Sequence, residues 1–100
     1  MNVVARQTLI DFWGKYPKTK ALLQHWLNVT KAADWKSTQS VVGTFSKAKG
    51  LNSERVRFEV ACGEFRMIVA FDFRRQMAFI KFIGTRDQYV KVDAKTVSLF

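Results

Sequence analysis

Apolar residues in the first third of the chain recur at the spacing of amphipathic helices. A first helix is predicted to start after Thr8, a suitable N-cap, and to be bounded by Gly14 and Pro17. Its apolar side is formed by Leu9, Ile10, Phe12, Trp13 and Tyr16. A second helix is predicted over residues 18–33, where apolar residues form one stripe and lysines lie outside it. Trp26 belongs to that stripe, so we interpret it as a core residue.

From residue 55 onward the apolar residues alternate with polar ones, which is the pattern of half-buried strands. Three strands are predicted over residues 55–60, 65–73 and 77–83, whereas the weakly periodic stretch 33–52 is interpreted as a loop with a short helix. Short turn signals separate the strands, so they are expected to form an antiparallel meander. The pattern therefore predicts one α+β domain, with two N-terminal helices packed on a small antiparallel β-sheet.

The turn between the first two predicted strands sets which residues face each other. A two-residue hairpin loop at Gly63 and Glu64 would place Val60 opposite Met67. In that register, the apolar residues of both strands share the core face. The opposite face carries Arg55, Arg57 and Arg66.

The second turn decides the face of the third strand. A loop of two or four residues near 74–76 keeps Ile80 and Phe82 with the core and brings Lys81 to the face of the arginines, whereas a three-residue loop reverses this. Beyond this strand the chain continues through Arg86, Tyr89 and Lys91. These residues are expected near Arg66 if the third strand pairs antiparallel with the second.

The composition adds a strong positive charge, because 17 Lys and Arg against 8 Asp and Glu give a formal net charge of +9. Such a field favours nucleic acid or an acidic protein surface as partner. The first 50 residues hold eight basic and two acidic residues, +6, whereas the last 50 hold nine and six, +3. Six of the seven arginines lie in the second half.

Arginines in the middle of strands have two interpretations. A planar guanidinium recognises phosphate through two hydrogen bonds, which favours a nucleic-acid surface. The alternative is a ladder of cross-strand ion pairs, in which Arg55 pairs with Asp72, and Arg57 or Arg66 pairs with Glu59. Both interpretations are open at this point.

The single cysteine, Cys62, cannot form a disulfide within the chain, so a reducing cytoplasm is the simplest compartment. The first residues lack the pattern of a signal peptide, and no apolar run has the length of a membrane span, so we expect a soluble cytoplasmic protein without a membrane partner. Neither Cys62 nor the only histidine, His25, has metal-ligand spacing. We therefore expect no metal and no other cofactor.

Several segments together are similar to a known family. They are Phe12-Trp13, Lys15-Tyr16-Pro17, Trp26, ADWK at 33–36, FEVACGEFRMIVAFDF at 58–73 and IKFIGTRDQYVKVD at 80–93. They resemble HigB-type toxins of the RelE-like superfamily of bacterial toxin–antitoxin modules. The resemblance implies an mRNA endonuclease that cuts messages in the ribosomal A site. It also implies a HigA-type helix-turn-helix antitoxin, through which alone operator DNA would be bound.

The resemblance also assigns residues. Arg66 matches the arginine on the family's active strand, and Arg57 falls close to a functional basic residue on the preceding strand. Arg86 stands where many HigB toxins have His, and Tyr89 matches the tyrosine three residues later. Lys91 matches a basic residue in the family's ending. We expect Arg57, Arg66, Arg86 and Tyr89 to be catalytic, and Arg55, Lys81 and Lys91 to bind RNA.

RNA cleavage without metal requires a base for the 2′-hydroxyl, stabilisation of the phosphorane charge and an acid for the leaving 5′-oxygen. Arg86 can supply charge, but a guanidinium does not exchange its proton in proteins. Tyr89 is then the side chain suited to act as the acid, and the base is left open between Glu59, Asp87 and a group of the ribosome. Two other functions stay open: a non-catalytic nucleic-acid binder, with exposed aromatics such as Phe79 stacking on bases, and a gyrase-poisoning relative on the same fold.

Overall fold

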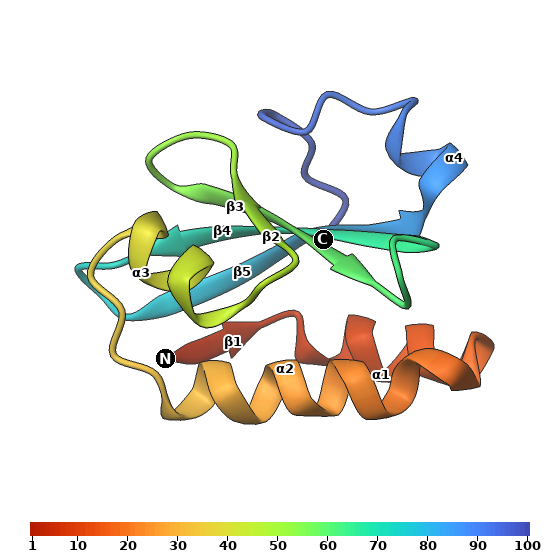
Figure 1. Ribbon diagram of the computed structural model, residues 1–100, viewed down its shortest axis with the longest axis horizontal. Helices are drawn as coiled ribbons and strands as arrows, with labels where there is room; N and C mark the ends of the chain where they lie inside the picture. The colour runs from red at the N-terminus through yellow and green to blue at the C-terminus, as the bar shows by residue number, and fades with distance from the viewer.

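The computed structural model describes residues 1–100, which form three layers (Figure 1). Helices α1 (Arg6–Lys15) and α2 (Lys20–Ala32) lie along one face of a five-stranded sheet, joined by the 3-10 turn η1 (Pro17–Thr19). The C-terminal residues run along the opposite face, after the single-turn helix α4 (Arg86–Tyr89). The α+β architecture, with two N-terminal helices on the sheet, agrees with the expectation from sequence.

The sheet has the strand order β1-β5-β4-β3-β2. Its strands are β1 (Asn2–Val4), β2 (Ala48–Gly50), β3 (Arg55–Val60), β4 (Phe65–Asp72) and β5 (Met77–Thr85). The antiparallel meander of β3, β4 and β5 is confirmed. The expectation of an entirely antiparallel sheet is wrong, because β1 pairs with β5 in parallel. Both edge strands have three residues, too few for an alternating pattern to be visible.

The β3–β4 loop has four residues, 61–64, instead of the two that were predicted. Three consecutive loop residues adopt left-handed conformations, with φ of 52° at Ala61, 57° at Cys62 and 84° at Gly63. As a result Val60 pairs with Phe65 and not with Met67, so the predicted register is wrong by two residues. A shift of two residues leaves every side chain on its predicted face and changes only its partners.

The β4–β5 loop, residues 73–76, also has four residues, and Ile80 lies in the core as predicted. A β-bulge at Lys81 then reverses the alternation, because Ile80 and Phe82 pair with adjacent residues of β4. Phe82 is buried, with 2% exposed, but it lies on the face away from α2 and outside the main core, so the prediction that it shares a face with Ile80 is wrong. Ile83 takes its place among the core residues.

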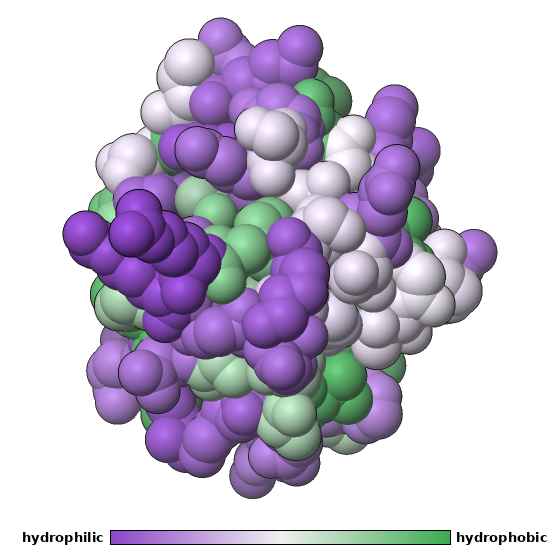
Figure 2. Space-filling view, turned by 90° about the vertical axis from the view of Figure 1, so that its left-hand side faces the viewer, coloured by the Kyte–Doolittle hydropathy of each residue, from purple (hydrophilic) through white to green (hydrophobic).

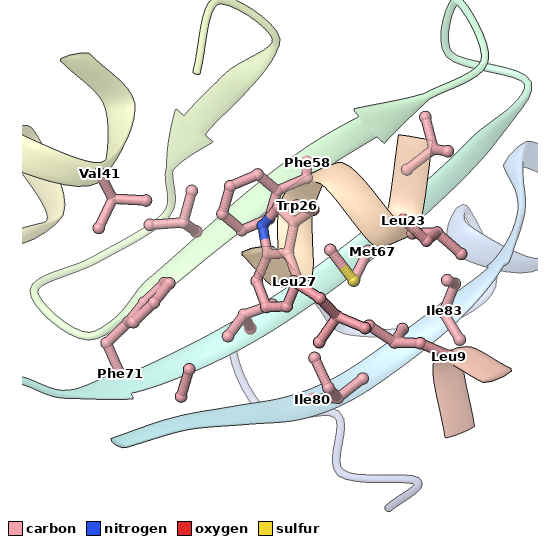
Figure 3. Packing of buried hydrophobic residues seen from close by; sticks show 14 of the residues in the cluster. Leu9, Leu23, Trp26, Leu27, Val41, Phe58, Met67, Phe71, Ile80 and Ile83 are labelled. Atoms are coloured by element: carbon pink, nitrogen blue, oxygen red, sulfur yellow. The ribbon is translucent and has the colours of Figure 1, made fainter. Parts of the chain in front are cut away.

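The main core lies between the helices and the sheet (Figure 3). Leu9, Leu23 and Met67, from α1, α2 and β4, are almost entirely inaccessible to solvent. Trp26 is buried, as predicted, and packs edge-on against Phe58 with ring centroids 5.6 Å apart. The helices therefore cover one face of the sheet, and the C-terminal segment lies on the other face.

Two helix boundaries differ from the sequence expectations. Helix α1 begins at Arg6, before Thr8, because Ala5 adopts a left-handed conformation with φ 68° and the chain turns there. Gly14 lies inside this helix and does not end it. The short helix expected within 33–52 is α3 (Thr38–Thr44), whose N-cap is Ser37.

Positive charge is spread over several parts of the surface. Arg74 and Arg75 are exposed in the β4–β5 loop, at the end of the sheet that lies to the left in Figure 1. Seen from that side, the molecule is mostly hydrophilic, and its hydrophobic atoms form small patches between polar ones (Figure 2). The net charge alone therefore does not locate a site, and the geometry of individual residues has to do so.

Candidate functional site

Two arginines from adjacent strands lie on the sheet face opposite α1 and α2. Arg57 on β3 and Arg66 on β4 are both partly buried, and the Arg66 side chain is only 15% exposed. Glu59 stands directly opposite Arg66 in the β3–β4 register, and its Oε1 atom lies 3.6 Å from Arg66 Nη2. The cross-strand ion pair between Arg66 and Glu59, one of the two interpretations of the sequence, is therefore present.

Tyr89 reaches the same arginine from α4. A capping box starts this helix: Thr85 Oγ1 accepts a hydrogen bond from the Gln88 amide, and Gln88 Oε1 accepts one from the Thr85 amide. One turn later, the Tyr89 ring lies 5.0 Å from the Arg66 guanidinium carbon and packs edge-on against Phe82. A cation, a carboxylate and a phenol thus converge at Arg66.

Gly84 allows α4 to fold back over the end of β5. A Cβ atom at this position would lie 2.5 Å from Gln88 Oε1 and 2.9 Å from Cζ of Phe82. No side chain fits between these groups, so the close approach of α4 depends on glycine. Through this approach, the glycine helps to hold Tyr89 against Arg66.

The Nε atoms of Arg57 and Arg66 are buried and have no hydrogen-bond acceptor within the protein. An unsatisfied buried donor of this kind typically destabilises a fold by about 1–3 kcal/mol. Because these two Nε atoms are inaccessible to solvent, a bound anion would meet Arg57 and Arg66 through the parts of their side chains that stay exposed. The face therefore offers two guanidinium charges beside a carboxylate and a phenol, which is a set of groups suited to a phosphodiester.

Arg55, expected to bind RNA, has a different environment. Its Nη1 donates hydrogen bonds to the backbone oxygens of Ala94, at 3.2 Å, and Val97, at 2.7 Å. The alternative interpretation, in which Arg55 pairs with Asp72, is wrong, because Asp72 pairs instead with Arg75 at 3.8 Å. In this structure Arg55 holds the C-terminal segment against the sheet, a contact between distant residues that no local pattern indicates.

The remaining predicted residues form no ion pair or hydrogen bond with the side chains of the Arg66 group. Lys81 is on the same side of the sheet, where its Nζ lies 5.4 Å from the centre of the Phe79 ring and 3.4 Å from Ser98 Oγ. Arg86 is exposed at the start of α4 and lines a different hollow, without an ion pair to the Arg66 group. Lys91 is exposed beyond α4 and forms no ion pair.

One further cation was missed by the sequence reasoning. Lys49 lies directly opposite Arg57 in the β2–β3 ladder and is exposed. Because residues 33–52 were interpreted as a loop with a short helix, nothing indicated that Lys49 would extend the row of basic residues. Recognition of β2 as a strand would have been the signal.

Comparison with known proteins identifies the family. The family model for HigB toxins, described as the RelE-like toxic component of a toxin–antitoxin system, matches residues 19–92. The match includes Arg57, Glu59, Arg66 and Tyr89. No individually curated protein gives a significant match. No helix of the structure is long and apolar enough to cross a membrane, and no three His, Cys, Asp or Glu side chains gather where they could hold a metal ion.

The family match covers about three quarters of the chain and contains the whole β3–β4–β5 meander. A toxic component of this kind acts with an antitoxin as its partner. The fold of helices on a small sheet, with basic side chains on the free face, agrees with the match. The chain therefore belongs to the HigB family of RelE-like toxins.

Proposed function

We propose that this toxin is a ribosome-dependent mRNA endonuclease that inhibits translation and is neutralised by a HigA-type antitoxin. The observation that carries the proposal is the group around Arg66, with Glu59 at 3.6 Å and the Tyr89 ring at 5.0 Å. The positive charge of the partly exposed Arg57 and Arg66 side chains gives this group its affinity for an anion. Membership of the HigB family supports the biological role.

The group can carry out an internal transfer at an RNA phosphodiester. Glu59 accepts the proton of the 2′-hydroxyl, and the 2′-oxygen forms a bond to the adjacent phosphorus. The phosphorane charge is stabilised by the guanidinium groups of Arg57 and Arg66. The bond to the 5′-oxygen then breaks, and Tyr89 donates a proton to that oxygen. The products are a 2′,3′-cyclic phosphate and a 5′-hydroxyl, with no metal or other cofactor in any step.

The structure favours Glu59 over Asp87 as the base. Glu59 lies on the same face as Arg66 and in contact with it. Asp87 lines the same separate hollow as Arg86, next to the β3–β4 loop. The contact with the Arg66 guanidinium also fixes the position of the Glu59 carboxylate.

The partners follow from the charge and the family. The lysine-rich first half of the chain attracts ribosomal RNA over long range, so binding should weaken as salt is raised. Lys49 belongs to this lysine-rich half and lies opposite Arg57, so it connects the basic first half of the chain with the Arg66 group. The antitoxin we propose is a HigA-type helix-turn-helix protein, through which the pair binds its operator DNA. The site of action is the cytoplasm, where ribosomes translate.

The test is induction of the wild-type chain and its variants in bacteria, with growth and the 5′ ends of mRNA as readouts. We expect Arg66→Ala to reduce cleavage in the ribosomal A site by about 10²–10³-fold, the typical effect of removing one transition-state donor. Arg66→Lys should recover only part of it, because an ammonium lacks the two-pronged geometry. The matched control is Arg74→Ala, which removes an exposed arginine without an ion pair.

Equal cleavage by wild type and Arg66→Ala would contradict the catalytic assignment. Growth arrest accompanied by an SOS response, without mRNA cleavage, would instead indicate a gyrase poison. Salt-sensitive RNA binding without toxicity or cleavage would indicate a non-catalytic binder.

A further inference from the structure

A second hollow lies at the end of the sheet, beside the start of α4. Its volume is about 710 Å³, and it is bounded by η1 and the end of α1, by the β3–β4 loop and by the start of α4. The side chains that matter for its chemistry are Tyr16, Lys18, Glu64, Phe65, Arg86 and Asp87. None of these residues takes part in the cleavage steps proposed above.

One wall of this hollow is aromatic and firmly packed. Tyr16 is partly buried, and its ring centre lies 4.7 Å from that of Phe65 and 4.8 Å from that of Phe12. Phe65 itself is only 2% exposed. Lys15 Nζ lies over the Tyr16 ring, 5.5 Å from its centre, so a planar ligand that stacks on this ring would have to displace that flexible side chain.

The polar groups of the hollow are of two kinds. Lys18 and Glu64 form an ion pair with each other. Arg86 and Asp87, in contrast, are exposed and form no ion pair or side-chain hydrogen bond, although they are neighbours in the chain. The N–H donors of the Arg86 guanidinium and the oxygens of the Asp87 carboxylate are therefore unpaired in the same hollow as the aromatic wall.

The charge balance points to a neutral ligand and not to a phosphate. Two cationic and two anionic side chains line the hollow, so their formal charges cancel. A phosphate would meet two carboxylates there, whereas the edge of a nucleobase presents both donors and acceptors and can use both kinds of group. Sequence-specific recognition of single-stranded RNA commonly combines such edge contacts with stacking on an aromatic ring.

The position relative to the Arg66 group suits a neighbouring nucleotide. Arg86 and Tyr89 are the first and last residues of α4, about 4.5 Å apart along the helix axis at 1.5 Å per residue. If the cleaved phosphodiester of an RNA strand lies against Arg66 and Tyr89, the hollow is about one nucleotide further along that RNA strand.

We propose that this hollow binds a guanine base adjacent to the cleaved bond, an inference that rests on the proposed endonuclease function. The Arg86 guanidinium donates to O6 and N7 of guanine, the commonest specific contact of arginine with a base. The Asp87 carboxylate accepts from the N1 and N2 hydrogens. The base stacks on the wall formed by Tyr16. Adenine presents an amino donor where guanine has O6, so it loses the paired contact with Arg86.

The first test maps cleavage positions across many messages for the wild-type chain, Arg86→Lys and Asp87→Asn. We expect guanine to be enriched at one position flanking the wild-type cuts, and each substitution to reduce this enrichment by about tenfold or more. The matched control, Arg6→Lys, changes an exposed arginine far from the hollow and should keep the wild-type pattern. Cleavage by the wild type without a flanking guanine preference, or with one that both variants retain, would overturn the subsite and leave the endonuclease assignment intact.

The second test does not depend on cleavage. Guanosine 5′-monophosphate, titrated into the isolated chain and followed by amide NMR, should shift the signals of Cys62, Thr85 and Arg86 more strongly than the adenosine, cytidine and uridine monophosphates do. Arg86→Lys should abolish the difference between the nucleotides. Equal shifts with all four nucleotides, or none near the hollow, would overturn the proposal. If the wild type cleaves no RNA, the endonuclease proposal fails, and this titration alone decides the hollow.

Discussion

Replacement of Arg55 by alanine should release the C-terminal segment from the sheet. Arg55 donates two hydrogen bonds to this segment, at 2.7 Å to Val97 and 3.2 Å to Ala94. Hydrogen bonds from charged groups contribute about 1.5–3 kcal/mol each, and the longer of these two should contribute less. We therefore expect the free energy of opening the segment to fall by about 2–4 kcal/mol.

Amide hydrogen exchange measures this opening residue by residue. The amides of Val97, bonded to Asp93, and Leu99, bonded to Lys81, report on the segment. At 1.36 kcal/mol per tenfold change, the protection factors of these amides should fall by about 30-fold to 1000-fold. An amide whose wild-type protection factor is smaller than that fall should lose its protection entirely. Amides in the centre of β4 should change much less.

Two comparisons make the result interpretable. Arg74→Ala removes an exposed arginine without an ion pair and should leave exchange at Val97 and Leu99 unchanged. Arg55→Lys should give an intermediate effect, because an ammonium can still donate to one of the two carbonyls. Unchanged protection in Arg55→Ala would refute the reasoning and return Arg55 to the residues available for RNA.

Three further predictions concern stability and the position of α4. Met67→Ala removes a fully buried side chain from the central strand and should destabilise the fold by about 2–5 kcal/mol in urea unfolding. Gly84→Ala places a Cβ 2.9 Å from a ring carbon of β5, so it should lower the melting temperature and reduce RNA cleavage by moving Tyr89, whereas Gly43→Ala, at an open position, should do neither. Lys18→Ala removes one partner of the exposed ion pair with Glu64, and the unfolding free energy should change by less than about 1 kcal/mol.

The strands and their faces could be predicted from sequence because alternation of polar and apolar residues is a local property. Arg57 and Arg66 were placed on one face correctly, and the four-residue loop did not disturb this because it shifted the register by an even number. The partners across the strands were not predictable. Left-handed backbone is a common conformation for Gly63, but nothing in the sequence marks Ala61 and Cys62 as adopting it.

Other parts of the site depend on contacts between residues far apart in the chain. Arg55 bonds to backbone oxygens 39 and 42 residues later, and the polar–apolar pattern carries no information about such a pair. The bulge at Lys81 moved Phe82 to the other face, where its ring supports Tyr89. The position of Tyr89 near Arg66 was nevertheless expected, because antiparallel pairing of β4 and β5 brings the start of one strand to the end of the other.

The strand order also has a consequence for how the chain folds as it is synthesised. β5 lies between β4 and β1, so the first strand made pairs with one of the last, some 75 residues later. Arg55 likewise lacks its acceptors until Val97 has been added. Contacts so distant in sequence form slowly and late. A chain that ends before β5 therefore holds neither a closed sheet nor, because Tyr89 is still missing, an assembled Arg66 group.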